Sequence, residues 1–307
     1  MLTSFDAIFT KLTSLPKKHL VVAWGIDAHS IGAAAAAIKK GFVDVTLVGD
    51  REIIEKICAE ENIAPAIFNI VPVAEELPAI ARAVELVNAG EGDLLMKGMC
   101  STDKYMRAIL NKEKGLLPPK AVLSHITLIA HEHYHKLLLV SDIAVIPVPD
   151  LHQKTIIISY LVTAAHRLGI ARPKVAVVAA TEQMLPTLPA CVDGAILSKM
   201  VDRGQIKDCL LDGPLSLDVS ISKEAANIKM VESEVAGDAD CLLFPNLEAA
   251  NVFYKTITQL SPKAHIAAVV TGAKVPCVLS SRGDTAETKL NSIALAALMA
   301  AKSMNNE

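Results

Sequence analysis

The chain has 307 residues, of which 52% are hydrophobic and 4% aromatic, and its formal net charge at pH 7 is -3. A length prior of roughly 150 residues per domain predicts two domains, and a core of Ala, Val, Ile and Leu is typical of buried parallel sheets. The acidic balance and the lack of a basic run argue against nucleic-acid binding, and the lack of a long apolar run argues against a membrane protein.

The N-terminal residues and the cysteines both favour the cytoplasm. Residues 1–18 include Asp6 and contain no apolar segment with a small-residue cleavage site, so they differ from a signal peptide. The six cysteines are scattered singly, without the paired spacing of zinc or redox sites. We therefore expect a soluble cytoplasmic protein with reduced thiols that mostly fill the core.

The first third of the chain alternates short aliphatic runs with helical patterns. This alternation predicts a parallel sheet flanked by helices. The predicted strands are residues 19–24, 43–49, 68–73 and 92–98, and the predicted helices are residues 30–40, 51–62, 74–90 and 101–111.

A stretch rich in Pro and Gly at residues 113–122 marks a predicted crossing between domains. Two aliphatic runs, 121–130 and 136–148, follow without a helix between them and predict an antiparallel pair. The alternation then resumes with a predicted helix at 150–168, strands at 173–181, 208–214 and 240–245, and a helix at 285–303.

The predicted fold class is therefore α/β, with two α/β lobes of mainly parallel sheets and an interdomain cleft where ligands would bind. Residues 1–120 plus 272–307 are predicted to form the first lobe. Residues 121–271 are predicted to form the second lobe.

Residues just after the strands should carry the chemistry, because ligands bind beyond the carboxyl ends of parallel strands. In residues 278–289, a strand leads through Ser281 and Arg282 into a helix whose start, Asp284 to Glu287, is typical of a cap. Backbone N–H groups at the helix start and the guanidinium of Arg282 would suit a phosphate-like anion. On spacing alone, a capped turn with a surface ion pair is an equal alternative.

A similar strand-to-helix turn lies at residues 96–102. Lys97 ends the strand, and Ser101 or Thr102 precedes the helix, which suggests a second anion contact. An ordinary turn with a solvated lysine explains the same pattern, and spacing alone favours that alternative.

Long segments of the chain resemble the phosphate acetyl/butyryltransferase family in order and spacing. The resemblance covers nearly the whole chain, and the ending ETKLNSIALA is more similar to the butyryl branch than to the acetyl branch. The segments that carry it are DGPLSLDVSISKEAA, SEVAGDADCLLFPNLEAANVFYK and TGAKVPCVLSSRGDTAETKLNSIALA, with LLMKG, LSHI, YHKLLLVSD, PKVAVVAA and LSKMVDRGQI.

The resemblance implies a two-lobed fold, a homo-oligomer (a dimer or higher) and reversible transfer of a short-chain acyl group. An acyl-CoA and inorganic phosphate would give an acyl phosphate and CoA, without a cofactor or a metal ion. Phosphate can attack the thioester directly if it is held in line, so we expect no covalent acyl-enzyme. The acyl group is expected to be butyryl or branched, and acetyl transfer is the nearest alternative.

The resemblance also implies which residues act. Ser281 and Arg282 match the catalytic serine and arginine of the acetyl branch, so we expect Arg282 to bind phosphate. Ser281 should donate a hydrogen bond to the oxyanion or the thiolate sulfur. Supporting substrate contacts are expected from Lys97, Thr102, Ser124 and Asn251.

Two departures from the family pattern leave the general base open. The acetyl branch has an aspartate seven positions after the serine, where this chain has Thr288. Asp284 and Glu287 are nearby carboxylates, but neither occupies that position. Ala250 stands where the family usually has a glycine before Asn251, so the backbone there is less able to approach a ligand closely.

Three histidines suggest a different kind of site. His131, His133 and His135 alternate and would share one face of an extended strand, which could form a metal site. No carboxylate or cysteine completes a set, so a solvated strand edge is favoured. His125 could contact substrate or fill the core.

Other function classes find less support. A decarboxylating dehydrogenase of the isocitrate type would need a cluster of metal-binding aspartates, and the glycines of residues 25–32 have the wrong spacing for a dinucleotide fingerprint. Cys100 has no His or Asp partner in sequence that would support a thiol nucleophile. A noncatalytic CoA-binding module remains an alternative, suggested by Thr288 and Ala250.

Overall fold

The structure is a computed structural model that describes residues 1–261, 263–279 and 284–300. The chain divides into two compact units, each described by itself below. The first unit consists of Phe5–Leu123 and Ile266–Glu307, and the second consists of Met1–Ser4 and Ser124–His265. The predicted cleft between two lobes stays a prediction, as do the predicted domain boundaries.

The first unit is built on a mainly parallel sheet in the order β3-β2-β1-β4-β11-β10. Neighbouring strands run parallel except β10 and β11, which pair antiparallel. Its strands are β1 (Lys18–Ala23), β2 (Val43–Gly49), β3 (Asn69–Pro72), β4 (Leu94–Lys97), β10 (His265–Thr271, whose first residue belongs to the second unit) and β11 (Cys277–Val278).

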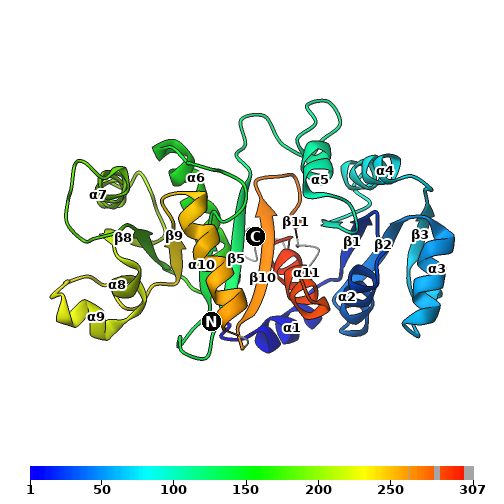
Figure 1. Cartoon of the computed structure of the whole chain (residues 1–307), viewed down its shortest axis with the longest axis horizontal. Helices are drawn as coiled ribbons and strands as arrows, with labels where there is room; N and C mark the ends of the chain where they lie inside the picture. Colours follow the sequence, from blue (N-terminus) through cyan, green and yellow to red (C-terminus); the bar gives the residue numbers. More distant parts are fainter. Residues whose placement is uncertain (262, 280–283, 301–307) are drawn as a thin grey trace. The chain divides into compact units, whose positions relative to one another are not determined.

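Helices cover both faces of these strands. Figure 1 shows α4 and α5 on one side of β1 to β3, with α2 and α3 on the other. These helices are α1 (Phe5–Thr13), α2 (Ala28–Lys39), α3 (Arg51–Glu60), the 3-10 helix η1 (Pro65–Ile67), α4 (Glu76–Asn88), α5 (Thr102–Ile109) and α11 (Ala286–Ala300).

The core of the first unit is formed by aliphatic strands that are buried on both faces. Residues 20–23 of β1 are completely buried, as expected for a central parallel strand. Helix α2 packs against α11, and several of its small side chains, including Ala33, Ala34 and Ala37, are buried.

The second unit is built on strands in the order β5-β6-β9-β7-β8. All its neighbouring strands are parallel except β5 and β6, so the predicted antiparallel pair is confirmed. Its elements are β5 (Ser124–Ala130), β6 (Leu138–Ser141), α6 (Leu151–Arg167), β7 (Lys174–Val178), α7 (Pro189–Asp202), β8 (Leu210–Leu215), α8 (Leu217–Ile221), α9 (Lys223–Ile228), β9 (Cys241–Leu243) and α10 (Leu247–Leu260).

One local prediction is wrong. His131, His133 and His135 were expected on an extended strand, but residues 131–137 form the irregular turn that joins β5 to β6. The Tyr134 N–H donates to the carbonyl of His131 at 3.0 Å, and the His133 N–H donates to Nδ1 of His131 at 3.1 Å. These local hydrogen bonds fold the segment back on itself, so the alternating histidines do not share a strand face.

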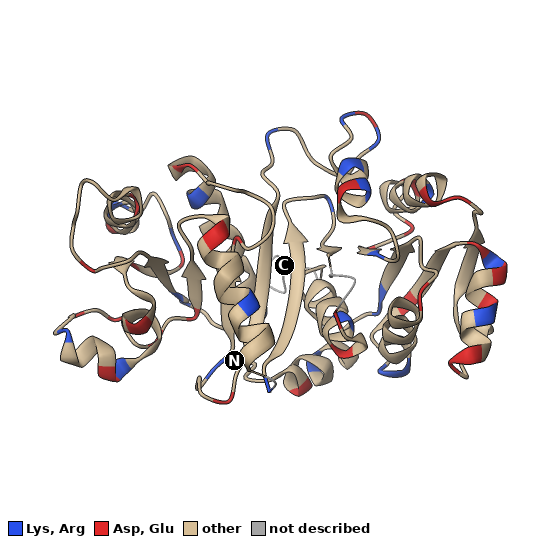
Figure 2. Ribbon diagram, in the orientation of Figure 1, with Lys and Arg blue, Asp and Glu red and all other residues tan. Residues whose placement is uncertain are grey.

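Charged side chains of both signs lie next to one another on the exposed helices. Figure 2 shows this along α3, where Arg51 pairs with Glu55 and Lys56 pairs with Glu60. Within the described ranges, the helices are all too short or too polar to cross a bilayer.

Candidate active site

The turn between β4 and α5 encloses Lys97. This lysine is only 1% exposed, and its Nζ donates to the carbonyl oxygens of Gly98 at 3.1 Å and Cys100 at 3.0 Å. A Cβ atom at position 98 would lie 2.2 Å from the carbonyl oxygen of Trp24, so only glycine lets the end of β4 approach the end of β1 so closely. The alternative of a solvated Lys97 is therefore wrong, because its ammonium is buried against its own turn.

Two other residues of this turn have different environments. Thr102 is exposed and is the first residue of α5, whereas Ser101 is the N-cap and accepts the Lys104 N–H at 3.3 Å. Cys100 is completely buried, and this burial raises the pKa of its thiol to about 11 despite the nearby charge of Lys97. A thiol with such a pKa is a poor nucleophile at neutral pH.

The end of β1 adds a carboxylate to the same edge of the sheet. Ala23 pairs with Lys97 and Val278 with Met96, so the parallel strands β1, β4 and β11 end side by side. Asp27 follows β1 and caps α2, with its Oδ1 accepting the Ser30 N–H at 2.9 Å.

The first turn of α11 contributes a buried lysine near Asp27. Lys289 is 2% exposed, and burial lowers its pKa although the charges of Asp27 and Asp284 act in the opposite direction. Asp27 and Lys289 therefore lie close enough for their charges to interact. Sequence reasoning missed both, although Asp27 follows a predicted strand within a few residues and Lys289 belongs to the segment 278–289.

The predicted catalytic pair, Ser281 and Arg282, lies outside the described residues. The described start of α11 falls within the predicted range, Asp284 to Glu287. Thr285 Oγ1 accepts the Thr288 N–H at 3.1 Å and lies 3.1 Å from Thr288 Oγ1, so Thr285 has a capping role at this helix start.

In the second unit, Ser124 and Asn251 both lie near the loop that follows β6. The hydroxyl of Ser124 lies 3.0 Å from that of Ser141, and both residues are completely buried. Asn251, on α10, donates from Nδ2 to the carbonyl of Ile143 at 3.2 Å. Between them, the buried Asp142 accepts N–H groups of His125, Ala144 and Val145, and it therefore fixes the shape of this loop.

A second polar cluster in this unit lies beyond the carboxyl ends of β7 and β8. The Ser216 hydroxyl contacts the carboxylates of Glu182 and Asp218, and Lys229 Nζ lies 3.0 Å from the Ser216 oxygen. Hydrogen bonds from Ser216 and Lys229 lower the pKa of Asp218 to about 2. Ser216 and Asp218 belong to the segment DGPLSLD, which carries part of the family resemblance.

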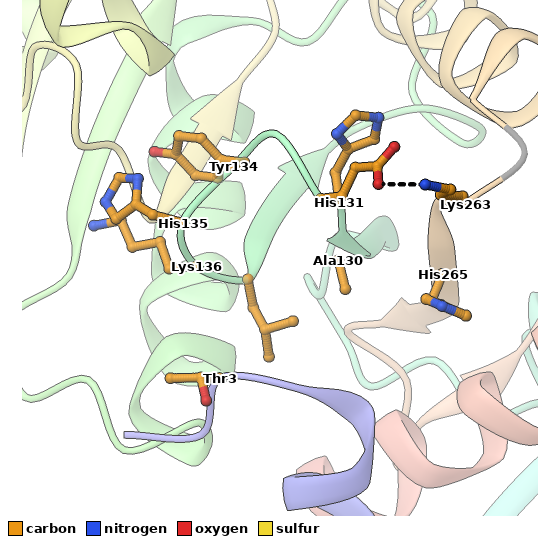
Figure 3. A pocket seen from close by; sticks show the side chains of 10 residues that line it. Thr3, Ala130, His131, Tyr134, His135, Lys136, Lys263 and His265 are labelled. Carbon is orange, nitrogen blue, oxygen red and sulfur yellow. Dashed lines mark hydrogen bonds and ion pairs between the residues drawn. The ribbon is translucent and has the colours of Figure 1, made fainter.

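The second unit also contains a cavity of about 500 Å³ beside the turn between β5 and β6 (Figure 3). It lies at the opposite ends of these two strands from Ser124 and Ser141. Of the described residues predicted to contact substrate, Lys97, Thr102, Ser124 and Asn251 do not line it, whereas His131 and His135 of the histidine segment do. Its lysines are already paired: Lys263 with Glu132 at 2.8 Å, and Lys136 with Asp238 and Asp240. Among the described residues, no three His, Cys, Asp or Glu side chains come together in a way that could hold a metal ion.

Comparisons with known proteins identify the family. The model of the family "Phosphate acetyl/butaryl transferase" matches residues 75–297. The chain belongs to this family. It is 43% identical to the phosphate butyryltransferase of Clostridium acetobutylicum over 98% of this chain and 99% of that protein. It is 41% identical to the phosphate acetyltransferase of Thermotoga maritima over 92% of this chain and 95% of that protein.

A solved structure of the same kind confirms the α/β fold class. A branched-chain phosphotransacylase from Enterococcus faecalis superposes with a TM-score of 0.80 at 26% identity, covering 92% of this chain and 99% of that one. As a phosphate acyltransferase of this family, the chain carries Lys97 and Thr102 in its first unit and Ser124 and Asn251 in its second. Their roles as substrate contacts stay predictions.

Proposed function

We propose that the chain catalyses the reversible transfer of a short-chain acyl group between coenzyme A and inorganic phosphate. The observation that carries this proposal is the 43% identity to a phosphate butyryltransferase over almost the full length of both proteins. The buried cationic side chains at the edge of the first sheet, Lys97 and Lys289, support it because a phosphate dianion needs positive charge in a water-poor site.

In the proposed mechanism, phosphate attacks the thioester carbonyl directly. Arg282 holds the phosphate with its planar fork of N–H groups, and Ser281 donates to the oxyanion or the departing sulfur. Lys97, Thr102, Ser124 and Asn251 are proposed as supporting substrate contacts. No cofactor is proposed, so CoA, acyl-CoA, phosphate and acyl phosphate are the partners of the reaction.

The acyl preference is proposed to be butyryl or a branched chain of similar size. The C-terminal segment ETKLNSIALA and the branched-chain phosphotransacylase structure support this choice. Sequence identity alone does little to distinguish a butyryl from an acetyl preference. The chain is 43% identical to the butyryltransferase and 41% identical to the acetyltransferase. We further propose a cytoplasmic homo-oligomer, as the family resemblance implies.

The test is thiol release by the purified full chain from acetyl-, propionyl-, butyryl-, isobutyryl- and isovaleryl-CoA. We expect release that depends on phosphate, needs no added metal or nicotinamide cofactor, and is fastest with a four- or five-carbon acyl group. The acyl phosphate product is trapped as its hydroxamate. Thiol release that is independent of phosphate would identify a hydrolase instead. Activity that disappears with a chelator and returns with zinc would contradict the metal-free proposal.

The same assay tests the phosphate site through Arg282→Ala. Loss of a bidentate, charge-assisted contact should lower kcat/KM for phosphate by about a hundredfold or more, and Arg282→Lys should recover only part of it. Arg107→Ala is the control, because Arg107 forms an exposed pair with Asp103 on the same unit. A larger effect on butyryl-CoA than on phosphate would assign Arg282 to the CoA phosphates.

A further inference from the structure

Two polar atoms at the start of α2 are buried and have no hydrogen-bond partner among the described residues. They are Oδ2 of Asp27 and Oγ of Ser30, and Ser30 is completely buried. A buried polar atom without a partner costs about 1–3 kcal/mol, so such atoms usually have a functional or ligand-related reason. Asp27 caps the helix through its other oxygen, Oδ1, so Oδ2 is not engaged by the cap.

Asp27 lies in the part of the first unit that also carries Lys97 and Lys289. It follows β1, whose end lies beside Lys97 at the end of β4. Asp27 is also close enough to Lys289, in the first turn of α11, for their charges to interact. Lys289 is one residue after Thr288, the position where the acetyl branch has its aspartate. A carboxylate from a different segment therefore lies near the helix turn that has a threonine at this position.

We propose that Asp27 is the general base of the acyl transfer, taking the place of the carboxylate that Thr288 cannot supply. The inference rests on the proposed function, because it assigns a proton acceptor to that same reaction. Lys289 provides a neighbouring positive charge that attracts the phosphate dianion.

Asp27 alone accepts and then returns the proton that moves during the reaction. As an oxygen of HPO₄²⁻ forms a bond to the thioester carbonyl carbon, its O–H bond breaks and the proton moves to Oδ2 of Asp27. The tetrahedral oxyanion then collapses, the C–S bond breaks, and the CoA thiolate takes the proton back from Asp27. The products are the acyl phosphate and CoA thiol, and no other reactant is required.

The experiment compares Asp27→Asn with the wild-type full chain. The amide keeps an oxygen that accepts the Ser30 N–H, so the helix cap is retained while the base is lost. We expect kcat with butyryl-CoA and phosphate to fall by about a hundredfold or more, which is the range for loss of a general base. Asp50→Asn is the matched control, because Asp50 caps α3 of the same unit through the N–H groups of Glu52 and Ile53, and it should keep wild-type kcat.

A second variant distinguishes a catalytic role of Asp27 from a structural one. Thr288→Asp, introduced into Asp27→Asn, restores a carboxylate at the acetyl-branch position and should raise kcat at least about tenfold above the single variant. A purely structural role for Asp27 predicts no gain from this carboxylate, and that result would overturn the assignment. If Asp27→Asn does not fold, Asp27→Ser replaces it, since serine is also a good N-cap.

The assignment is also overturned if folded Asp27→Asn retains kcat within about threefold of the wild type. Loss of a general base should lower kcat far more than that, by about a hundredfold or more. These outcomes are distinguishable from failure of the proposed function. A wild-type chain without phosphate-dependent thiol release would refute the acyl transfer itself, whereas an active wild type with an equally active Asp27→Asn would refute only the base.

Discussion

Cys100 lies inside the β4–α5 turn, where burial raises the pKa of its thiol to about 11. The thiolate is therefore scarce at neutral pH, and direct attack by phosphate leaves no step for it. We expect Cys100→Ala to keep kcat/KM within about threefold of the wild type and to lower the free energy of unfolding by about 1 kcal/mol.

The control for this prediction is Cys58→Ala, which truncates another completely buried cysteine of the same unit, on α3. Both variants should lose comparable stability, measured by urea unfolding, and both should remain active. A thioester trapped on Cys100 and detected by mass spectrometry would contradict direct transfer.

The environments of single side chains could not be predicted from the spacing of residues in the sequence. The sequence correctly predicts Lys97 at the end of a strand, but not its burial, because the close approach of Gly98 to Trp24 exists only in the folded unit. Asp27 and Lys289 are far apart in sequence, and their interaction depends on α2 packing against α11. Ser281 and Arg282 were identified by resemblance, and their geometry stays a prediction.

At the scale of elements, an ion-pair network joins the segments that lead into β6, β7 and β9. Asp238 pairs with Lys174 at 2.6 Å, with Lys136 at 2.9 Å and with His135 at 2.8 Å. Burial alone would raise the pKa of Asp238, but the hydrogen bonds from these three side chains hold it well below its usual range. The charged form of Asp238 therefore stabilises the fold.

This network predicts a specific dependence of stability on pH. Because the folded-state pKa of Asp238 is depressed, its contribution is fully present above the unfolded-state pKa of about 4 and is lost as the pH falls below that value. Asp238→Asn should therefore lower the free energy of unfolding at pH 7, and its difference from the wild type should narrow between about pH 5 and pH 2. Urea unfolding at a series of pH values measures this difference.

The control is Asp202→Asn, which removes an exposed pair with Lys199 on α7. An exposed pair contributes little, so this variant should follow the wild type across the pH range. A difference between Asp238→Asn and the wild type that stays constant down to pH 2 would contradict the assignment.

The elements themselves were largely predictable, because the strands are short aliphatic runs and several long helices, including α2, α3 and α6, begin with a capping side chain. The antiparallel pairing of β5 and β6 followed from the lack of a helix between two such runs. The histidine segment was misjudged because alternation alone does not distinguish a strand from a turn with local hydrogen bonds. The start of α11 was predicted within residues 284–287, and Thr285 caps it there in the structure.

At the scale of the whole molecule, the family resemblance predicts a homo-oligomer. Light scattering of the purified chain should give a mass of at least twice the 32.6 kDa of one chain. If folding and association are coupled, the midpoint of thermal unfolding should also rise with protein concentration. A mass of one chain at every concentration tested would contradict this prediction.

The sequence also contains one tryptophan, Trp24, and the structure places it at the end of β1 beside Gly98 and close in sequence to Asp27. All tryptophan fluorescence of the protein therefore arises at the sheet edge where phosphate is proposed to bind. Phosphate or CoA can be titrated against this intrinsic emission without any label. The same signal from the Asp27→Asn and Arg282→Ala proteins would report occupancy separately from turnover, in an optical measurement that requires no catalysis.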